Sequence, residues 1–92
     1  MSVELTARRF VIRGRVQGVG YRYFAQNAAL EWRVSGYARN LQDGTVEVYA
    51  VGTAGQLSEF AAILRTGPRF SDVRSVDMQE AALENHKGFR IR

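Results

Sequence analysis

The residues with the clearest capacity for chemistry lie between Gly14 and Arg22, in the stretch Gly-Arg-Val-Gln-Gly-Val-Gly-Tyr-Arg. This stretch follows an alternating apolar run and precedes a helical pattern, which predicts a strand-to-helix turn. Gly18 and Gly20 allow several N–H groups to point inward, because no Cβ blocks positive φ or a close ligand. A helix predicted from Tyr21 adds unpaired N–H groups, and Arg22 adds a charged fork suited to phosphate or carboxylate. Together these residues predict an anion-binding cradle, although they would also fit a tight connection with an exposed arginine.

The chain has 92 residues, of which 46% are hydrophobic, with a single proline and no cysteine. This length suits one domain, 1–92, with a modest core, and the absence of cysteine excludes disulfides and thiolate metal sites. We find no apolar segment of signal-peptide or membrane-spanning length and therefore expect a cytoplasmic protein. The formal net charge of +4 fits an anionic partner, either a small phosphate compound or a nucleic acid.

Hydrophobic periodicity predicts five strands and two helices around the cradle. The strands are expected at about 8–17, 34–40, 45–51, 72–81 and 88–91, and the helices at about 21–32 and from Thr53 to the Gly67-Pro68 stop signal. Thr53 and Gln56 have the spacing of a capping box at the start of the second helix. Asp43 and Gly44 are typical of a hairpin turn, so the strands on either side of them must pair antiparallel.

The order strand-helix-strand-strand-helix-strand, with a short terminal strand, predicts an α+β protein of the ferredoxin-like, split-βαβ class. Two helices would cover one face of a four- to five-stranded sheet of antiparallel type. Phe10, Ile12 and Val16 would face these helices, and the arginines of the first strand would line the open face.

Two segments now lie at recognisable positions: Gly14–Arg22 closes the first strand, and Gly36–Val46 covers the second strand and its turn. Together they closely resemble the two signatures of the acylphosphatase family, whose members are small ferredoxin-like enzymes. Essentially the whole chain shares the resemblance, including the Phe-x-Ile pattern of Phe89 and Ile91. The resemblance implies hydrolysis of an acyl phosphate to a carboxylate and inorganic phosphate, with no metal, no other cofactor and no phosphoenzyme.

The resemblance also implies roles for individual residues. Arg22 would bind the phosphoryl group, and Asn40 would orient the attacking water. Backbone N–H groups of the loop would bind the phosphate oxygens, at Gln17, Gly18, Val19, Gly20, Tyr21 and Arg22. From composition alone, the structural role of a strand end that enters a turn is favoured for Asn40. The match to both signatures favours the catalytic role.

We expect a monomer that acts on a small acyl phosphate and binds neither a membrane nor a nucleic acid. Two alternatives remain open. RNA-recognition modules share this order of elements and present aromatic residues on the open sheet face, where Tyr37 and Tyr49 are candidates. A catalytically silent maturation module is the second alternative, because a similar domain begins larger proteins that use carbamoyl phosphate.

Two further residues carry expectations that depend on local structure. His86 is the only histidine and lies in a polar loop, so we expect it to be solvated. Arg33 follows the first predicted helix, where members of the family often have glycine. If the backbone there is left-handed, Arg33 carries a small strain cost.

Overall fold

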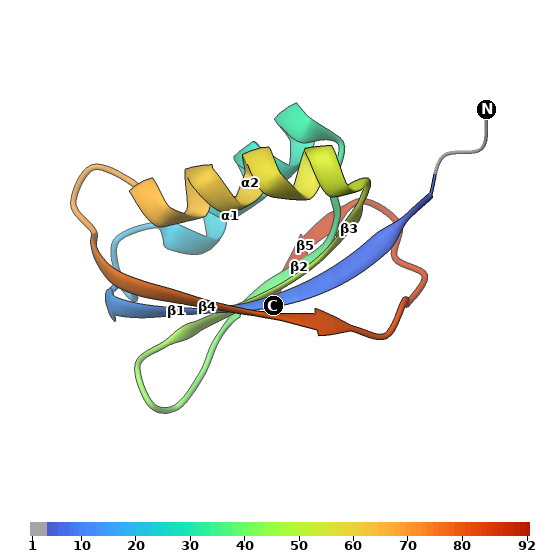
Figure 1. Ribbon diagram of the computed structural model, residues 1–92. Helices are drawn as coiled ribbons and strands as arrows, with labels where there is room; N and C mark the ends of the chain where they lie inside the picture. The colour runs from blue at the N-terminus through green and yellow to red at the C-terminus, as the bar shows by residue number, and fades with distance from the viewer. Residues whose placement is uncertain (1–3) are drawn as a thin grey trace.

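The computed structural model describes residues 4–92 and shows two helices packed on one face of a five-stranded sheet (Figure 1). The elements are β1 (Thr6–Arg15), α1 (Tyr21–Trp32), β2 (Ser35–Asn40), β3 (Val46–Gly52), α2 (Ala54–Thr66), β4 (Asp72–Ala81) and β5 (Phe89–Ile91). The predicted ferredoxin-like α+β fold is confirmed. β1 ends at Arg15, two residues before its expected end, so Val16 and Gln17 belong to the loop that follows.

The strand order across the sheet is β4-β1-β3-β2-β5, which leaves β1 and β3 in the interior. β1 pairs antiparallel with both β3 and β4, and β2 pairs antiparallel with β3. β5 instead runs parallel to β2, so the sheet is mixed rather than wholly antiparallel. The strand directions explain this pairing. β4 runs opposite to β2, so a chain that reverses direction after β4 runs in the same direction as β2.

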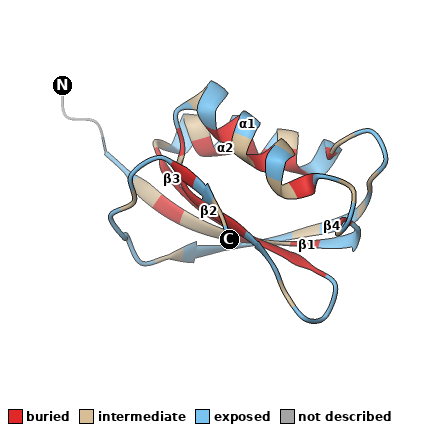
Figure 2. Cartoon of the chain, turned by 180° about the vertical axis from the view of Figure 1, so that it is seen from behind, coloured by how far each residue is buried: buried red, intermediate tan, exposed pale blue. Residues whose placement is uncertain are grey.

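The hydrophobic core lies between the sheet and the helices, where Figure 2 shows buried residues along the inner sides of both layers. Phe10 and Ile12 of β1 are fully buried, as the alternation predicts. The helices bury Tyr21, Ala25, Ala28 and Ala29 of α1 and Leu57, Phe60, Ala61 and Leu64 of α2. The small alanines of α1 allow this helix to lie close to the sheet.

Local signals define the ends of α2. The Thr53 side chain accepts a hydrogen bond from the Gln56 N–H, and the Gln56 side chain accepts one from the Thr53 N–H, so the predicted capping box is confirmed. The helix ends at Thr66, immediately before Gly67 and Pro68. Neither helix in the described part of the chain is long and apolar enough to cross a membrane.

The open face of the sheet is partly covered by the segment between β4 and β5. The Tyr37 and Tyr49 rings stack with their centroids 5.6 Å apart, and the His86 ring packs against both. The Tyr49 hydroxyl accepts a hydrogen bond from the Glu84 N–H and donates one to the Ala82 carbonyl. The expectation of a solvated His86 is therefore wrong: its side chain is only 14% exposed, because residues 82–88 fold back over the two tyrosines.

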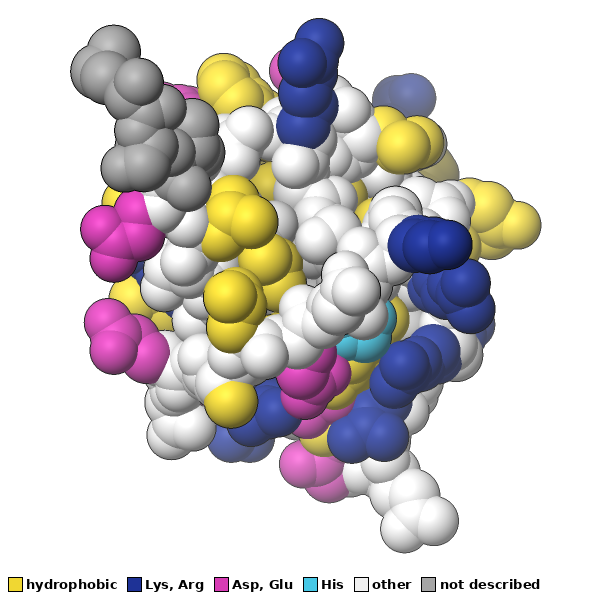
Figure 3. Space-filling model, turned by 90° about the vertical axis from the view of Figure 1, so that its right-hand side faces the viewer, with side chains coloured by type: hydrophobic (Ala, Val, Ile, Leu, Met, Phe, Trp, Pro, Cys, Tyr) yellow, Lys and Arg dark blue, Asp and Glu magenta, His cyan; other side chains and the backbone are white. Residues whose placement is uncertain are grey.

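Figure 3 shows the end of the molecule where this segment lies, with the histidine between acidic and basic side chains. A hollow of about 370 Å³ lies here. Its lining residues are Leu5, Ser35, Val51, Leu83, Glu84, Asn85 and His86. None of the predicted site residues is among them, so this hollow is separate from the cradle.

Arg33 ends α1 in the left-handed conformation, with φ 56° and ψ 42°, and is the only residue of 4–92 other than glycine with positive φ. We predict that Arg33→Gly raises the free energy of unfolding by about 1 kcal/mol, because glycine adopts this conformation without a Cβ clash. Urea denaturation measures the change.

Arg33→Ala is the matched control, since it removes the same exposed side chain but keeps the Cβ. It should give no comparable gain. Equal stabilisation in both variants would show that the side chain, and not the backbone conformation, is the source of the effect.

Candidate active site

A small pocket opens where the loop between β1 and α1 meets the ends of β2 and β5. Its volume is about 100 Å³. The residues that line it are Val16, Gly18, Gly20, Tyr21, Arg22, Tyr23, Asn40 and Ile91. Arg22 from α1 and Asn40 from β2 therefore meet at one site, as the two sequence segments predict.

The loop provides an open backbone surface at the start of α1. Gly18 and Gly20 have φ values of 75° and 80°, and Gly20 begins the helix in the left-handed conformation. No side chain caps this helix, and a Cβ added at either glycine would meet nothing within 4 Å. The first-turn N–H groups of α1 are thus left without a side-chain acceptor, which suits an anion.

Arg22 is held by the end of β5. One terminal nitrogen of its guanidinium donates a hydrogen bond of 2.7 Å to the backbone oxygen of Arg92. Arg92 is itself fixed, because its N–H donates to the Ala38 carbonyl and its guanidinium lies 4.0 Å from the centroid of the Tyr37 ring. A guanidinium has five N–H donors, so this contact orients Arg22 and leaves donors for a ligand.

Asn40 is the last residue of β2, and strand alternation sets the direction of its side chain. Ala38 belongs to the core beneath the helices and Tyr37 to the cluster on the open face. Asn40 therefore lies on the helix side with Ala38, while Arg39 faces the open side. Within residues 4–92 the Asn40 amide makes no hydrogen bond, so it is available to a ligand or a water molecule.

Gln17 ties the loop to the turn that follows Asn40. Its side-chain amide donates hydrogen bonds of 2.8 Å to the Leu41 carbonyl and 2.9 Å to the Thr45 carbonyl. The turn is further closed by a hydrogen bond from the Leu41 N–H to the Thr45 carbonyl. These hydrogen bonds hold the loop before α1 at a fixed distance from the turn that follows β2.

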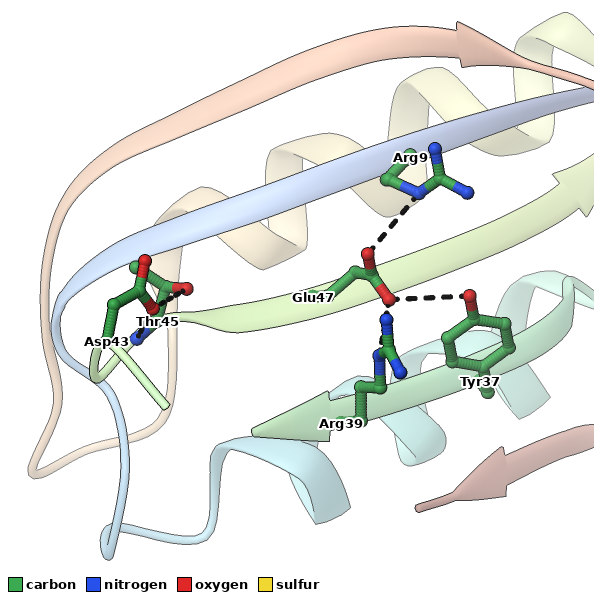
Figure 4. A network of polar contacts seen from close by, with 6 residues as sticks. All are labelled: Arg9, Tyr37, Arg39, Asp43, Thr45 and Glu47. Carbon is green, nitrogen blue, oxygen red and sulfur yellow. Dashed lines mark hydrogen bonds and ion pairs between the residues drawn. The ribbon is translucent and has the colours of Figure 1, made fainter. Parts of the chain in front are cut away.

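Asp43 stabilises the same turn, as Figure 4 shows. Its carboxylate accepts hydrogen bonds from the Thr45 hydroxyl at 2.6 Å and from the Thr45 N–H at 3.0 Å. These hydrogen bonds favour the charged carboxylate and lower the pKa of Asp43 below its usual value. The turn's contribution to stability through Asp43 is therefore present near neutral pH and falls as the carboxylate is protonated in acid.

Glu47 organises the open face behind Asn40 (Figure 4). It is only 7% exposed, yet its carboxylate lies 2.6 Å from Arg39 Nε and 3.4 Å from Arg9 Nε. The Tyr37 hydroxyl also donates to it, at 3.3 Å. These contacts compensate the buried charge and connect β1, β3 and β2 just below the site.

The Tyr21 hydroxyl has a structural role. It donates a hydrogen bond of 2.7 Å to the Leu64 carbonyl of α2, and its side chain is buried. Burial raises the pKa of Tyr21, because the phenolate would be desolvated. This hydroxyl therefore anchors α1 on α2 and is not positioned to exchange a proton with a ligand in the pocket.

Of the predicted site residues, Gly18, Gly20, Tyr21, Arg22 and Asn40 line the pocket. Gln17 and Val19 do not: Gln17 bonds the turn, and Val19 packs against the core. The proposed role of their backbone N–H groups stays a prediction. Among residues 4–92 no group of three or more histidine, cysteine or acidic side chains could hold a metal ion.

Sequence reasoning missed three lining residues and the contact that fixes Arg22. The periodicity places Val16 in the first strand, Ile91 enters only through the Phe-x-Ile pattern, and no pattern in the sequence indicates a role for Tyr23. The parallel pairing of Ala38 with Ile91 brings β5 to the pocket, and no local signal reveals such a pairing. The position of Tyr23, next to Arg22, was the available clue.

The fold and the pocket together define a small α+β protein with a glycine-containing loop and an uncapped start of its first helix at the pocket. A family model described as acylphosphatase matches residues 8–91. An acylphosphatase of Solibacter usitatus is 62% identical over 86 residues, which cover 94% of this chain and 90% of the relative. An acylphosphatase of Archaeoglobus fulgidus is 39% identical over 87 residues, 95% of this chain and 98% of the relative.

The structural comparison agrees. The crystal structure of acylphosphatase from Bacillus subtilis superposes with a TM-score of 0.92 at 38% identity, covering 97% of this chain and 99% of that one. The chain therefore belongs to the acylphosphatase family, and it is an enzyme of the class that hydrolyses acyl phosphates.

We predict that Gln17→Ala lowers the free energy of unfolding by about 2 kcal/mol, because two hydrogen bonds to the turn are lost at about 1 kcal/mol each. Thermal or urea denaturation measures the loss. Gln42→Ala is the matched control: Gln42 is exposed in the same turn, and its removal should change stability by less than about 0.5 kcal/mol. Similar losses in both variants would contradict the assigned role of Gln17.

Proposed function

We propose that the chain hydrolyses acyl phosphates with the phosphoryl group held by Arg22 and by N–H groups of residues 17–22, and with the attacking water oriented by Asn40. The observation that carries this proposal is that Arg22 and Asn40 line the same pocket of about 100 Å³, beside the uncapped start of α1. The positive charge and the N–H groups suit a dianionic phosphoryl group.

In the proposed reaction, water attacks phosphorus while the bond from phosphorus to the bridging oxygen breaks. The bridging oxygen leaves with the acyl group as a carboxylate, and one proton of the water passes to a phosphate oxygen. The products are a carboxylate and dihydrogen phosphate. Because the phosphoryl transition state is loose and anionic, the protein's main contributions are positioning and stabilisation of charge.

The lining residues support a reaction without a side-chain base. No aspartate, glutamate or histidine is among them, and the Tyr21 hydroxyl is engaged by Leu64. A carboxylate is a good leaving group, so a strong general acid is not required. The substrate's own phosphate is then the proton acceptor, and Arg22 with the N–H groups supplies the positive charge that a metal ion would otherwise provide.

The proposal extends to the partners and the setting: a monomer that acts in the cytoplasm on a small acyl phosphate, and not on a nucleic acid. Its support is the open face of the sheet. Tyr37 and Tyr49, the aromatic residues that could have stacked on bases, are 6% and 0% exposed beneath residues 82–88. An RNA-recognition surface of this fold needs such rings exposed.

The central test is hydrolysis of benzoyl phosphate and acetyl phosphate by the purified protein in the presence of a chelator. We predict that Arg22→Ala lowers kcat/KM by at least about 100-fold, because it removes the charge that stabilises the transition state. Inhibition by inorganic phosphate should weaken in parallel.

Arg65→Ala is the matched control, since it removes the same charge from the exposed end of α2 and should keep nearly full activity. Full activity in a folded Arg22→Ala protein would overturn the site assignment. Activity that is lost with the chelator and restored by a metal would overturn the metal-free mechanism.

For Asn40→Ala we predict a fall in kcat of about 100-fold or more with little change in phosphate inhibition, because Asn40 is proposed to orient water and not to bind the phosphoryl group. Steady-state kinetics with phosphate as a competitive inhibitor separates the two effects. Loss of phosphate inhibition with an unchanged kcat would assign Asn40 to phosphate binding instead.

A further inference from the structure

We propose that the Tyr23 ring is the docking surface for the acyl group of the substrate, and that the enzyme consequently favours acyl phosphates with an aromatic or bulky apolar acyl group. This inference rests on the proposed function, because it concerns the other half of the same substrate. It is carried by the size of the pocket, the exposure of Tyr23 and the chemistry of the pocket rim.

The pocket is too small for a whole acyl phosphate with an aromatic or bulky acyl group. Its volume of about 100 Å³ is well below the roughly 300–1,000 Å³ of pockets that enclose a drug-sized ligand. A phosphoryl group bound at Arg22 fills such a space. The acyl group must then extend over the rim, where its surroundings decide which acyl groups bind well.

The rim is apolar where Tyr23 and Ile91 reach the surface. Val16 and Tyr21 also line the pocket, but each is only 1% exposed and therefore forms its inner wall. Ile91 is half-buried. Tyr23 is 68% exposed and is the largest exposed apolar surface among the lining residues.

The geometry of α1 explains why Tyr23 faces outward. Successive residues of a helix are rotated by about 100°, so residues two apart point in nearly opposite directions. Tyr21 points inward and bonds Leu64, so Tyr23 points away from the core. Arg22 lies between them in the sequence and lines the same pocket as Tyr23, so the Tyr23 ring is at the rim of the pocket that is proposed to hold the phosphate.

The other exposed hydrophobic side chains do not share this position. Leu30 and Phe70 are similarly exposed, at 66% and 73%, but neither lines the pocket. Single exposed apolar side chains are common on protein surfaces and need no function. The argument for Tyr23 is therefore its place on the pocket rim together with its exposure.

An acyl group stacked on Tyr23 would be held equally in the ground state and the transition state, since it lies away from the reacting phosphorus. Contacts of this kind affect KM more than kcat. The hydroxyl of Tyr23 has no part in the contact. Phenylalanine should therefore replace tyrosine, whereas alanine should not.

The test compares Tyr23→Ala and Tyr23→Phe with the unmodified enzyme on benzoyl phosphate and acetyl phosphate. Tyr23→Ala should raise KM for benzoyl phosphate by about 5- to 10-fold, the effect of one lost aromatic contact, and KM for acetyl phosphate by less than about 2-fold. The inhibition constant of inorganic phosphate should stay unchanged. Tyr23→Phe should retain the preference, and Leu30→Ala, on the same helix, serves as the control and should leave both KM values unchanged.

The outcomes separate the two proposals. If the unmodified enzyme hydrolyses both substrates but Tyr23→Ala shifts the two KM values equally or not at all, the docking role falls and the proposed function stands. A weaker phosphate inhibition in Tyr23→Ala would likewise overturn the docking role, because it would assign Tyr23 to the phosphate half of the site. If the unmodified enzyme hydrolyses neither substrate, both proposals fall together.

Discussion

The site depends on the antiparallel pairing of β3 with both β1 and β2. Two strands that each run opposite to the same neighbour run parallel to each other. The carboxyl ends of β1 and β2 therefore lie at the same end of the sheet. The loop that starts α1 follows the first of these ends, and Asn40 is the second. β5 runs parallel to β2 and brings Ile91 and Arg92 to the same end of the sheet. The sheet thus assembles the site before any side-chain contact is considered.

Side-chain hydrogen bonds then hold the loop, the turn and Arg22 in place at this end of the sheet. Gln17 holds the loop to the turn after Asn40, and the backbone oxygen of Arg92 orients Arg22. On the opposite face, Glu47 links β1, β3 and β2 through two arginines and a tyrosine. The polar groups on the open face therefore act as supports for strand register, and two arginines of this face are engaged by Glu47.

Much of this arrangement is predictable from local sequence signals. The capping box at Thr53, the turn at Asp43 and the alternation around Phe10 each depend on neighbouring residues, and each is confirmed. The two signatures also brought Arg22 and Asn40 to one pocket. Features that were missed depend on distant partners: the burial of His86 against two tyrosines and the parallel β5 arise from contacts that no single segment encodes.

The glycines of the two sequence segments have different roles, and only the three-dimensional contacts distinguish these roles. A Cβ at Gly14 would overlap the backbone oxygen of Asp72, and a Cβ at Gly36 would overlap that of Tyr49, so these glycines allow close strand packing. A Cβ at Gly18 or Gly20 would meet nothing within 4 Å, so these glycines set the loop's conformation and leave space in front of it. Glycine thus allows dense packing in the sheet, and in the loop it leaves space for a ligand. The proposed anion site needs both, because the open loop keeps its shape only when a rigid sheet holds its ends.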